Sequence, residues 1–106
     1  MAWLYLFSAG LLEIVWAFTM KQSDGFTKLF PTIMTFVAAA ASFGLLSISM
    51  KTLPLGTAYV VWTGVGAVGA FLLGIAVLGE AASVARIAAG SLIIAGLILM
   101  KFSTPA

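Results

Sequence analysis

The sequence predicts an all-α membrane protein with four transmembrane helices per chain, and three observations support this fold class. Of 106 residues, 63% are hydrophobic and only 8% are charged, whereas a soluble domain carries roughly 25% charged residues. Four long apolar segments approach the roughly 20 residues that are needed to cross a bilayer. Only short polar breaks separate these segments, so residues 1–106 are predicted to form a single transmembrane domain.

The four predicted spans follow one another with clear chemical boundaries. Asp24 and Gly25 give a turn signal after the first span, and Pro54 interrupts the chain after the second. Ser83 is placed to cap the N-terminus of the fourth helix. Connections this short predict that consecutive helices are antiparallel neighbours. The predicted spans are residues 2–20, 30–50, 57–78 and 84–100.

The third predicted span contains the pattern G-x-G-x-x-G at Gly64, Gly66 and Gly69. A dinucleotide-binding turn would need a strand before it and an acidic residue about 20 residues further on. Here the glycines lie inside an apolar run, and the later region holds Arg86 instead. The pattern therefore belongs to a transmembrane helix and does not indicate a nucleotide cofactor.

Two explanations of these glycines remain open, and they are compatible. Gly66, Ala70 and Gly74 form a stripe of small residues at a spacing of four, which would let another helix approach closely. Glycine also weakens a helix by about 1 kcal/mol relative to alanine, so this span could bend between two transport states. We therefore predict a hinge or packing role for Gly64, Gly66 and Gly69.

The composition also excludes several classes of function. The chain has no cysteine and no histidine, so thiolate metal sites and the commonest general base are absent. Its net charge of +2 is too small for a nucleic-acid-binding surface. We predict no enzyme activity, no metal, no cofactor and no nucleic-acid partner.

Glu13 is the strongest candidate for a functional residue. It is the only ionisable residue deep inside a predicted span, about 3 Å along the helix axis from the middle of residues 2–20. A charged carboxylate at this depth costs several kcal/mol unless it is paired or neutralised. We predict that Glu13 binds cations and protons. The simpler alternative is a protonated side chain that only makes hydrogen bonds between helices.

Two neighbours at helical spacing share the face of Glu13. Gly10 lies three residues before it and leaves space, and Trp16 lies three residues after it. The indole ring of Trp16 would supply an aromatic wall and one N–H donor. This face is therefore predicted to contribute to the binding site.

The second and third spans add polar and aromatic groups. Tyr59, Trp62 and Thr63 fall on one face of the third span, and Ser42 and Ser49 share a face of the second. Each has a simpler alternative, because aromatic residues form interfacial belts and serines are tolerated inside membrane bundles. Together with a buried carboxylate, the aromatic rings and Ser42 are typical of a site for a small cation. For Ser49 we favour a packing role.

One chain is predicted to be insufficient for transport. Four helices can hardly enclose a solvated path with two gates, and a single Glu13 offers little coupling. A homodimer would supply eight helices and two glutamates. The fourth span carries the fewest functional residues, and we predict that it forms the dimer contact through Ala89, Gly90 and Gly96.

The distribution of basic residues bears on orientation. Three lie in the loops after the first and third spans and two lie on the other side, so the positive-inside rule barely selects one topology. A chain that inserts both ways can pair with itself in antiparallel fashion, with the inverted symmetry of many transporters. The first group is Lys21, Lys28 and Arg86, and the second is Lys51 and Lys101.

The four-span layout, the glutamate in "GLLEIVWAF" and the stretch "LPLGTAYVVWTGVGAVGA" resemble the small multidrug resistance family over essentially the whole chain. The resemblance implies an antiparallel, dual-topology homodimer in a bacterial plasma (inner) membrane that exchanges protons for cations. It maps the membrane-embedded glutamate of the family to Glu13, and the aromatic residues of its third span to Tyr59 and Trp62.

Finer features resemble the guanidinium exporter branch of that family. These are Gly10, Trp16, Ser42 and Lys51 before "TLP". The branch that exports bulky quaternary ammonium compounds usually has smaller residues near the position of Trp16. Proton-coupled export of guanidinium-like cations is therefore the leading hypothesis. Export of quaternary ammonium cations and a role as a non-transporting membrane partner remain alternatives.

Overall fold

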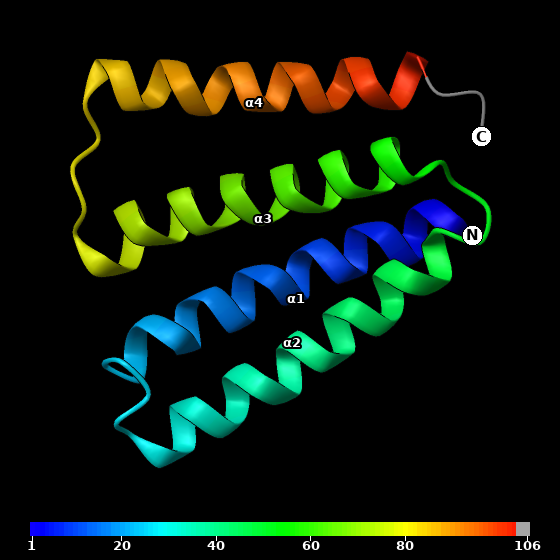
Figure 1. Cartoon of the computed structure of the whole chain (residues 1–106). Coiled ribbons are helices and arrows are strands. Elements are labelled where there is room, and N and C mark those ends of the chain that lie inside the picture. The colour runs from blue at the N-terminus through cyan, green and yellow to red at the C-terminus, as the bar shows by residue number, and fades with distance from the viewer. Residues whose placement is uncertain (104–106) are drawn as a thin grey trace.

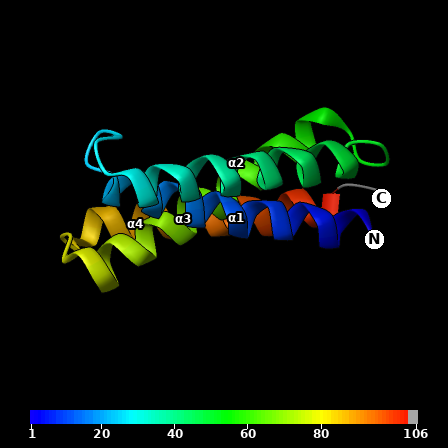
Figure 2. The same ribbon diagram turned by 90° about the horizontal axis from the view of Figure 1, so that it is seen from below.

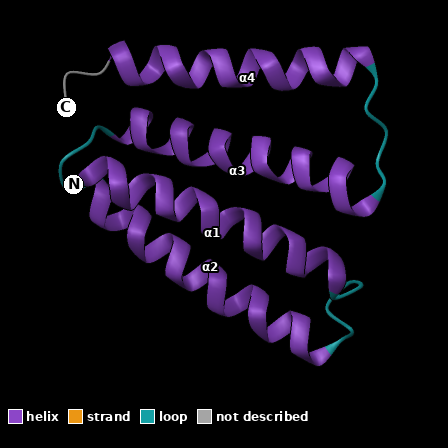
Figure 3. Cartoon of the chain, turned by 180° about the vertical axis from the view of Figure 1, so that it is seen from behind, coloured by secondary structure: helices purple, strands orange, loops and turns teal. Residues whose placement is uncertain are grey.

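The computed structural model describes residues 1–103, which form four α-helices and no strand (Figures 1 and 3). The helices have 20 to 24 residues and are long and apolar enough to cross a membrane. The predicted four-span layout is therefore confirmed, and each predicted boundary lies within three residues of a helix end. The helices are α1 (Ala2–Gln22), α2 (Leu29–Ser49), α3 (Leu55–Leu78) and α4 (Val84–Ser103).

The turn between α1 and α2 is held by Ser23. Its buried hydroxyl group donates to the carbonyl oxygen of Met20 at 2.6 Å and accepts from the backbone N–H of Phe26 at 3.0 Å. Asp24, Gly25 and Phe26 have φ angles of 50°, 73° and 65°, a left-handed conformation that is unfavourable for a side chain as large as phenylalanine. The hydrogen bonds of Ser23 fix this conformation, so the predicted Asp24–Gly25 turn is present.

The connection between α3 and α4 shows two standard helix-end motifs. Gly79 is left-handed with φ of 70°, and the backbone N–H of Glu80 donates to the carbonyl oxygen of Gly74 at 3.0 Å. A left-handed glycine just after the last helical residue is a common way to end a helix. The hydroxyl group of Ser83 accepts from the backbone N–H of Arg86 at 3.2 Å, which confirms the predicted N-cap of α4.

The helices lie in the spatial order α4, α3, α1, α2 (Figure 1). The expectation that consecutive helices are neighbours is correct for α1 with α2 and for α3 with α4. It is wrong for α2 and α3, because α1 lies between these two helices and they make few contacts with each other. A hydrogen bond of 2.7 Å between the hydroxyl groups of Thr19 and Thr35 joins α1 to α2. The α1 helix, which carries Glu13, therefore packs against both α2 and α3.

The molecule measures 43 × 34 × 16 Å, and Figure 2 shows this slab from its edge. A helix with its side chains is about 10–12 Å wide, so the chain is less than two helix diameters thick. Large apolar side chains cover its outside, as expected where lipid replaces water. The small core contains Leu6, Ala9, Leu46, Leu53, Ala58, Val61 and Trp62.

The two ends of the slab differ by one basic side chain. The α1–α2 and α3–α4 connections lie at one end, and the start of α1, the α2–α3 connection and the end of α4 lie at the other (Figure 1). The first end has three basic side chains and the second has two, as the sequence predicted.

Candidate functional site

The Glu13 side chain lies against the backbone of α3, where glycine makes room for it. A methyl group built at Gly66 would collide with the Glu13 carboxylate, and one built at Gly69 would collide with Ile14. A methyl group at Gly10 would come within 2.6 Å of Val65. Glycines on both helices therefore allow α1 and α3 to approach closely, which places the carboxylate on the α3 backbone.

Gly64 faces the other way on α3. A methyl group there would collide with the side chain of Leu97 on α4. The glycines of the third span thus sit at two different helix contacts, α1–α3 and α3–α4. These contacts account for packing, and the predicted hinge role of the three glycines stays a prediction.

A hydrogen-bonded relay joins three helices beside Glu13. The indole N–H of Trp62 on α3 donates to the hydroxyl oxygen of Ser42 at 3.0 Å. The Ser42 hydroxyl group on α2 donates in turn to the carbonyl oxygen of Ala9 on α1 at 2.7 Å. Ser42 is fully buried and Trp62 is 7% exposed. The relay therefore fixes α2 and α3 to α1 one helical turn before Glu13.

Ser49 differs from Ser42 although both are fully buried on the same face of α2. Its hydroxyl group donates to the carbonyl oxygen of Leu46 in its own helix at 2.7 Å. It makes no link to another helix among the described hydrogen bonds. The two serines therefore differ in the structure: Ser42 links three helices, whereas Ser49 bonds only within α2.

Four aromatic rings continue the site from α1 across α2 to α3. The ring of Trp16 lies 6.4 Å from that of Phe43 in an edge-to-face arrangement. Phe43 lies 5.8 Å from Trp62, and Trp62 lies 5.7 Å from Tyr59. These spacings are typical of interacting aromatic pairs. The row places Trp16, Trp62 and Tyr59 in one continuous wall.

Phe43 is the residue of this wall that the sequence analysis missed. It is one of eight phenylalanines, and no spacing rule within α2 distinguishes it from the others. Thr63, by contrast, was predicted to support the site, but it is exposed on α3 and takes no part in the relay or the aromatic row.

Two buried polar atoms of the site have no hydrogen-bond partner within residues 1–103. They are Oε1 of Glu13 and Nε1 of Trp16. Buried polar atoms are nearly always paired in folded proteins, and an unpaired carboxylate oxygen in a membrane interior is especially unfavourable. One atom accepts and the other donates, one turn apart on α1. The chain therefore presents an incomplete polar site at membrane depth.

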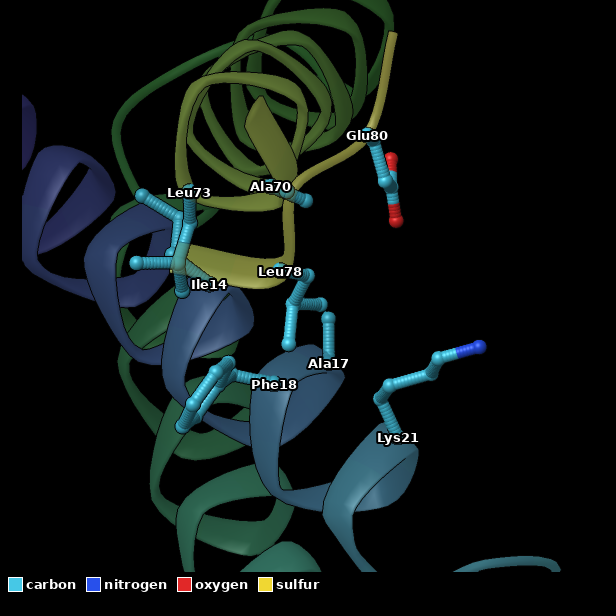
Figure 4. A pocket seen from close by; sticks show the side chains of 9 residues that line it. Ile14, Ala17, Phe18, Lys21, Ala70, Leu73, Leu78 and Glu80 are labelled. Carbon is cyan, nitrogen blue, oxygen red and sulfur yellow. The ribbon is translucent and has the colours of Figure 1, made fainter. Parts of the chain in front are cut away.

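A pocket of about 140 Å³ lies between α1 and α3. Figure 4 shows the Lys21 ammonium group and the Glu80 carboxylate at its rim, at the loop end of the two helices. The pocket begins at Ile14 and does not include Glu13. A single chain thus does not enclose its own membrane-embedded carboxylate in this cavity.

The predicted dimer residues on α4 fall in two environments. Gly90 is buried, and a methyl group there would lie 3.2 Å from the ring of Phe71 on α3. Ala89 and Gly96 are exposed, and apart from neighbouring residues of α4 no atom of residues 1–103 lies within 4 Å of a methyl group built at Gly96. Gly90 is therefore used inside the chain, while the dimer contact through α4 stays a prediction.

Comparison with known proteins identifies the family of this chain. Residues 1–94 match the family described as Small Multidrug Resistance protein. A guanidinium exporter from Yersinia pseudotuberculosis is 57% identical over 104 residues, which cover 98% of this chain and 100% of the relative. A guanidinium exporter from Citrobacter freundii is 55% identical over 104 residues, which cover 98% of this chain and 99% of the relative. The chain therefore belongs to the small multidrug resistance family, a family of multi-pass membrane transporters and not of enzymes.

Proposed function

We propose that this chain forms an antiparallel homodimer that exports guanidinium in exchange for protons across a bacterial inner membrane. The observation that carries the proposal is the unpartnered, buried Oε1 of Glu13. A carboxylate at this depth needs a positive partner, and none of the described residues supplies one. The only ion pair within residues 1–103 joins Arg86 to Glu80 at the loop end.

The need to neutralise Glu13 explains why a proton and a cation would be exchanged. A charged Glu13 is costly in the membrane unless a proton or a cation neutralises it. The same carboxylate oxygens would accept the proton and the cation, so the two compete for one site. A transporter that changes its open side only when Glu13 is neutralised then moves one species against the other.

Guanidinium fits this site better than a quaternary ammonium ion does. Guanidinium is flat and can donate two parallel N–H bonds to a carboxylate, and it stacks on aromatic rings. The row of Trp16, Phe43, Trp62 and Tyr59 offers such rings. A quaternary ammonium ion has no donor for Oε1 and needs more volume. Relatives named guanidinium exporter, at 55–57% identity, support the same choice.

Three features support a dimer of antiparallel copies. The chain is only 16 Å thick, the pocket between α1 and α3 does not include Glu13, and the numbers of basic residues at the two ends differ by one. A second copy would place another Glu13 near the first and would offer an acceptor to the unpartnered N–H of Trp16.

The test is proton movement in liposomes that contain only this protein. A pH-sensitive dye inside the vesicles would report protons that move when guanidinium or tetrapropylammonium is added outside. We expect guanidinium to drive proton movement at least tenfold faster than tetrapropylammonium. The reverse preference would favour the quaternary ammonium alternative, and no movement with either cation would favour a non-transporting partner subunit.

A further inference from the structure

An open apolar groove lies at the opposite end of the molecule from the pocket of Figure 4. It has a volume of about 370 Å³ and is formed by α1, α3 and α4. Several of its lining side chains are exposed, among them Phe7, Ile94 and Ile98 at 41%, 43% and 54%. The groove therefore faces outward. Its lining includes Trp3, Phe7, Val61, Ile94, Ile98 and Lys101.

Among the described residues that line the groove, Lys101 is the only charged one. Its ammonium nitrogen lies 4.3 Å from the centre of the Trp3 ring, a cation–π contact that fixes the charge at the mouth of the groove without neutralising it. The acidic side chains of the chain are Glu13, Asp24 and Glu80, and they lie in mid-span or at the other end. The positive charge of Lys101 therefore has no side-chain carboxylate near it.

We propose that this groove binds an anionic phospholipid, with one acyl chain along the apolar wall and the phosphate at Lys101. Ile94 and Lys101 in the groove wall are seven residues apart on α4, or about 10 Å along the helix axis. Half of the hydrocarbon core is about 15 Å thick. The groove is thus long enough to contact about two thirds of an acyl chain, starting from the headgroup. The charge of Lys101 lies at headgroup depth, where basic residues attract anionic lipids.

The position of the groove favours lipid over a second copy of the chain. At about 100° per residue, Gly96 lies about 200° around α4 from both Ile94 and Ile98. The exposed face of Ala89 and Gly96 that is predicted to contact the partner is thus on the other side of the helix. The preference for lipid over a second copy rests on this predicted dimer contact, which belongs to the proposed function.

The test is competition between two lipids of equal acyl chains, phosphatidylglycerol and phosphatidylcholine, on the intact purified protein. Native mass spectrometry would count the bound molecules of each. We expect phosphatidylglycerol to be preferred at least fivefold, and Lys101→Gln to remove most of this preference. Lys51→Gln is the matched control, because Lys51 lies at the same end but not in the groove. It should leave the preference unchanged.

A second variant tests the apolar wall separately. Ile94→Trp places a larger side chain in the groove from an exposed position, and it should reduce the binding of both lipids alike. Equal effects of Lys51→Gln and Lys101→Gln would overturn the proposal in favour of a diffuse basic surface. So would unchanged binding in Ile94→Trp, or a disulfide between two copies of an Ile98→Cys variant.

Discussion

Ser42→Ala should weaken the protein much more than Ser49→Ala, although both substitutions remove a fully buried hydroxyl group from the same face of α2. Ser42 links three helices through the indole N–H of Trp62 and the carbonyl oxygen of Ala9. Ser49 bonds only to Leu46 in its own helix. The two variants therefore differ in interhelical bonding and in little else.

The expected difference in stability between the two variants follows from the polar groups that each substitution leaves unpaired. Ser42→Ala leaves the indole N–H of Trp62 buried without an acceptor, which costs about 1–3 kcal/mol. Side-chain hydrogen bonds between membrane helices average about 0.6 and reach about 1.7 kcal/mol. We therefore expect Ser42→Ala to lower the free energy of unfolding by about 1–2 kcal/mol, and Ser49→Ala by less than about 0.5 kcal/mol.

The assay is equilibrium unfolding in mixed micelles, followed by a double-mutant cycle with Trp62→Phe. If the relay exists, removing both partners should cost less than the sum of the single losses, with a coupling of about 1 kcal/mol. Guanidinium transport should fall in Ser42→Ala and not in Ser49→Ala, because only the first releases the Trp62 ring. Equal losses for the two serines, or strictly additive effects with Trp62→Phe, would refute the relay.

Three further predictions concern selectivity, packing and topology. Trp16→Gly should lower guanidinium currents at least tenfold and admit bulkier cations; unchanged currents on intact dimers would show that Trp16 only packs. Gly66→Ala should lower transport at least tenfold because a methyl group there collides with the Glu13 carboxylate, whereas Gly56→Ala, with open space around it, should not; equal rates would refute the contact. Two lysines added to the α2–α3 loop should fix one orientation and reduce transport, which an oppositely biased variant should restore. Full activity of the single-orientation variant alone would contradict the antiparallel dimer.

The spans and their boundaries could be predicted because the bilayer imposes them. Its thickness fixes helix length, and the chain has few polar residues with which to end a helix. Ser83 could be identified as a cap for the same local reason, since an N-cap depends on residues within one turn. The depth of Glu13 also follows directly from span length.

The arrangement between helices could not be predicted in the same way. Short loops limit which helices can be neighbours, but they do not show that α1 lies between α2 and α3. Phe43 joins the site only because of that arrangement, which places its ring between Trp16 and Trp62. Gly90 and Gly96 look equivalent in the sequence, yet only Gly90 meets a ring from α3. Each of these features depends on helix rotation, which one sequence does not specify.

The central claim is that one carboxylate, Glu13, accepts protons and guanidinium in turn. Glu13→Gln keeps the shape of the side chain and removes its charge, and the shape complementarity with Gly66 should be retained. In liposomes with a pH-sensitive dye inside, we expect an outward guanidinium gradient to drive proton movement with the wild-type protein and none with Glu13→Gln, while cross-linking shows equal amounts of dimer. Guanidinium-driven proton movement that survives in Glu13→Gln would contradict the account.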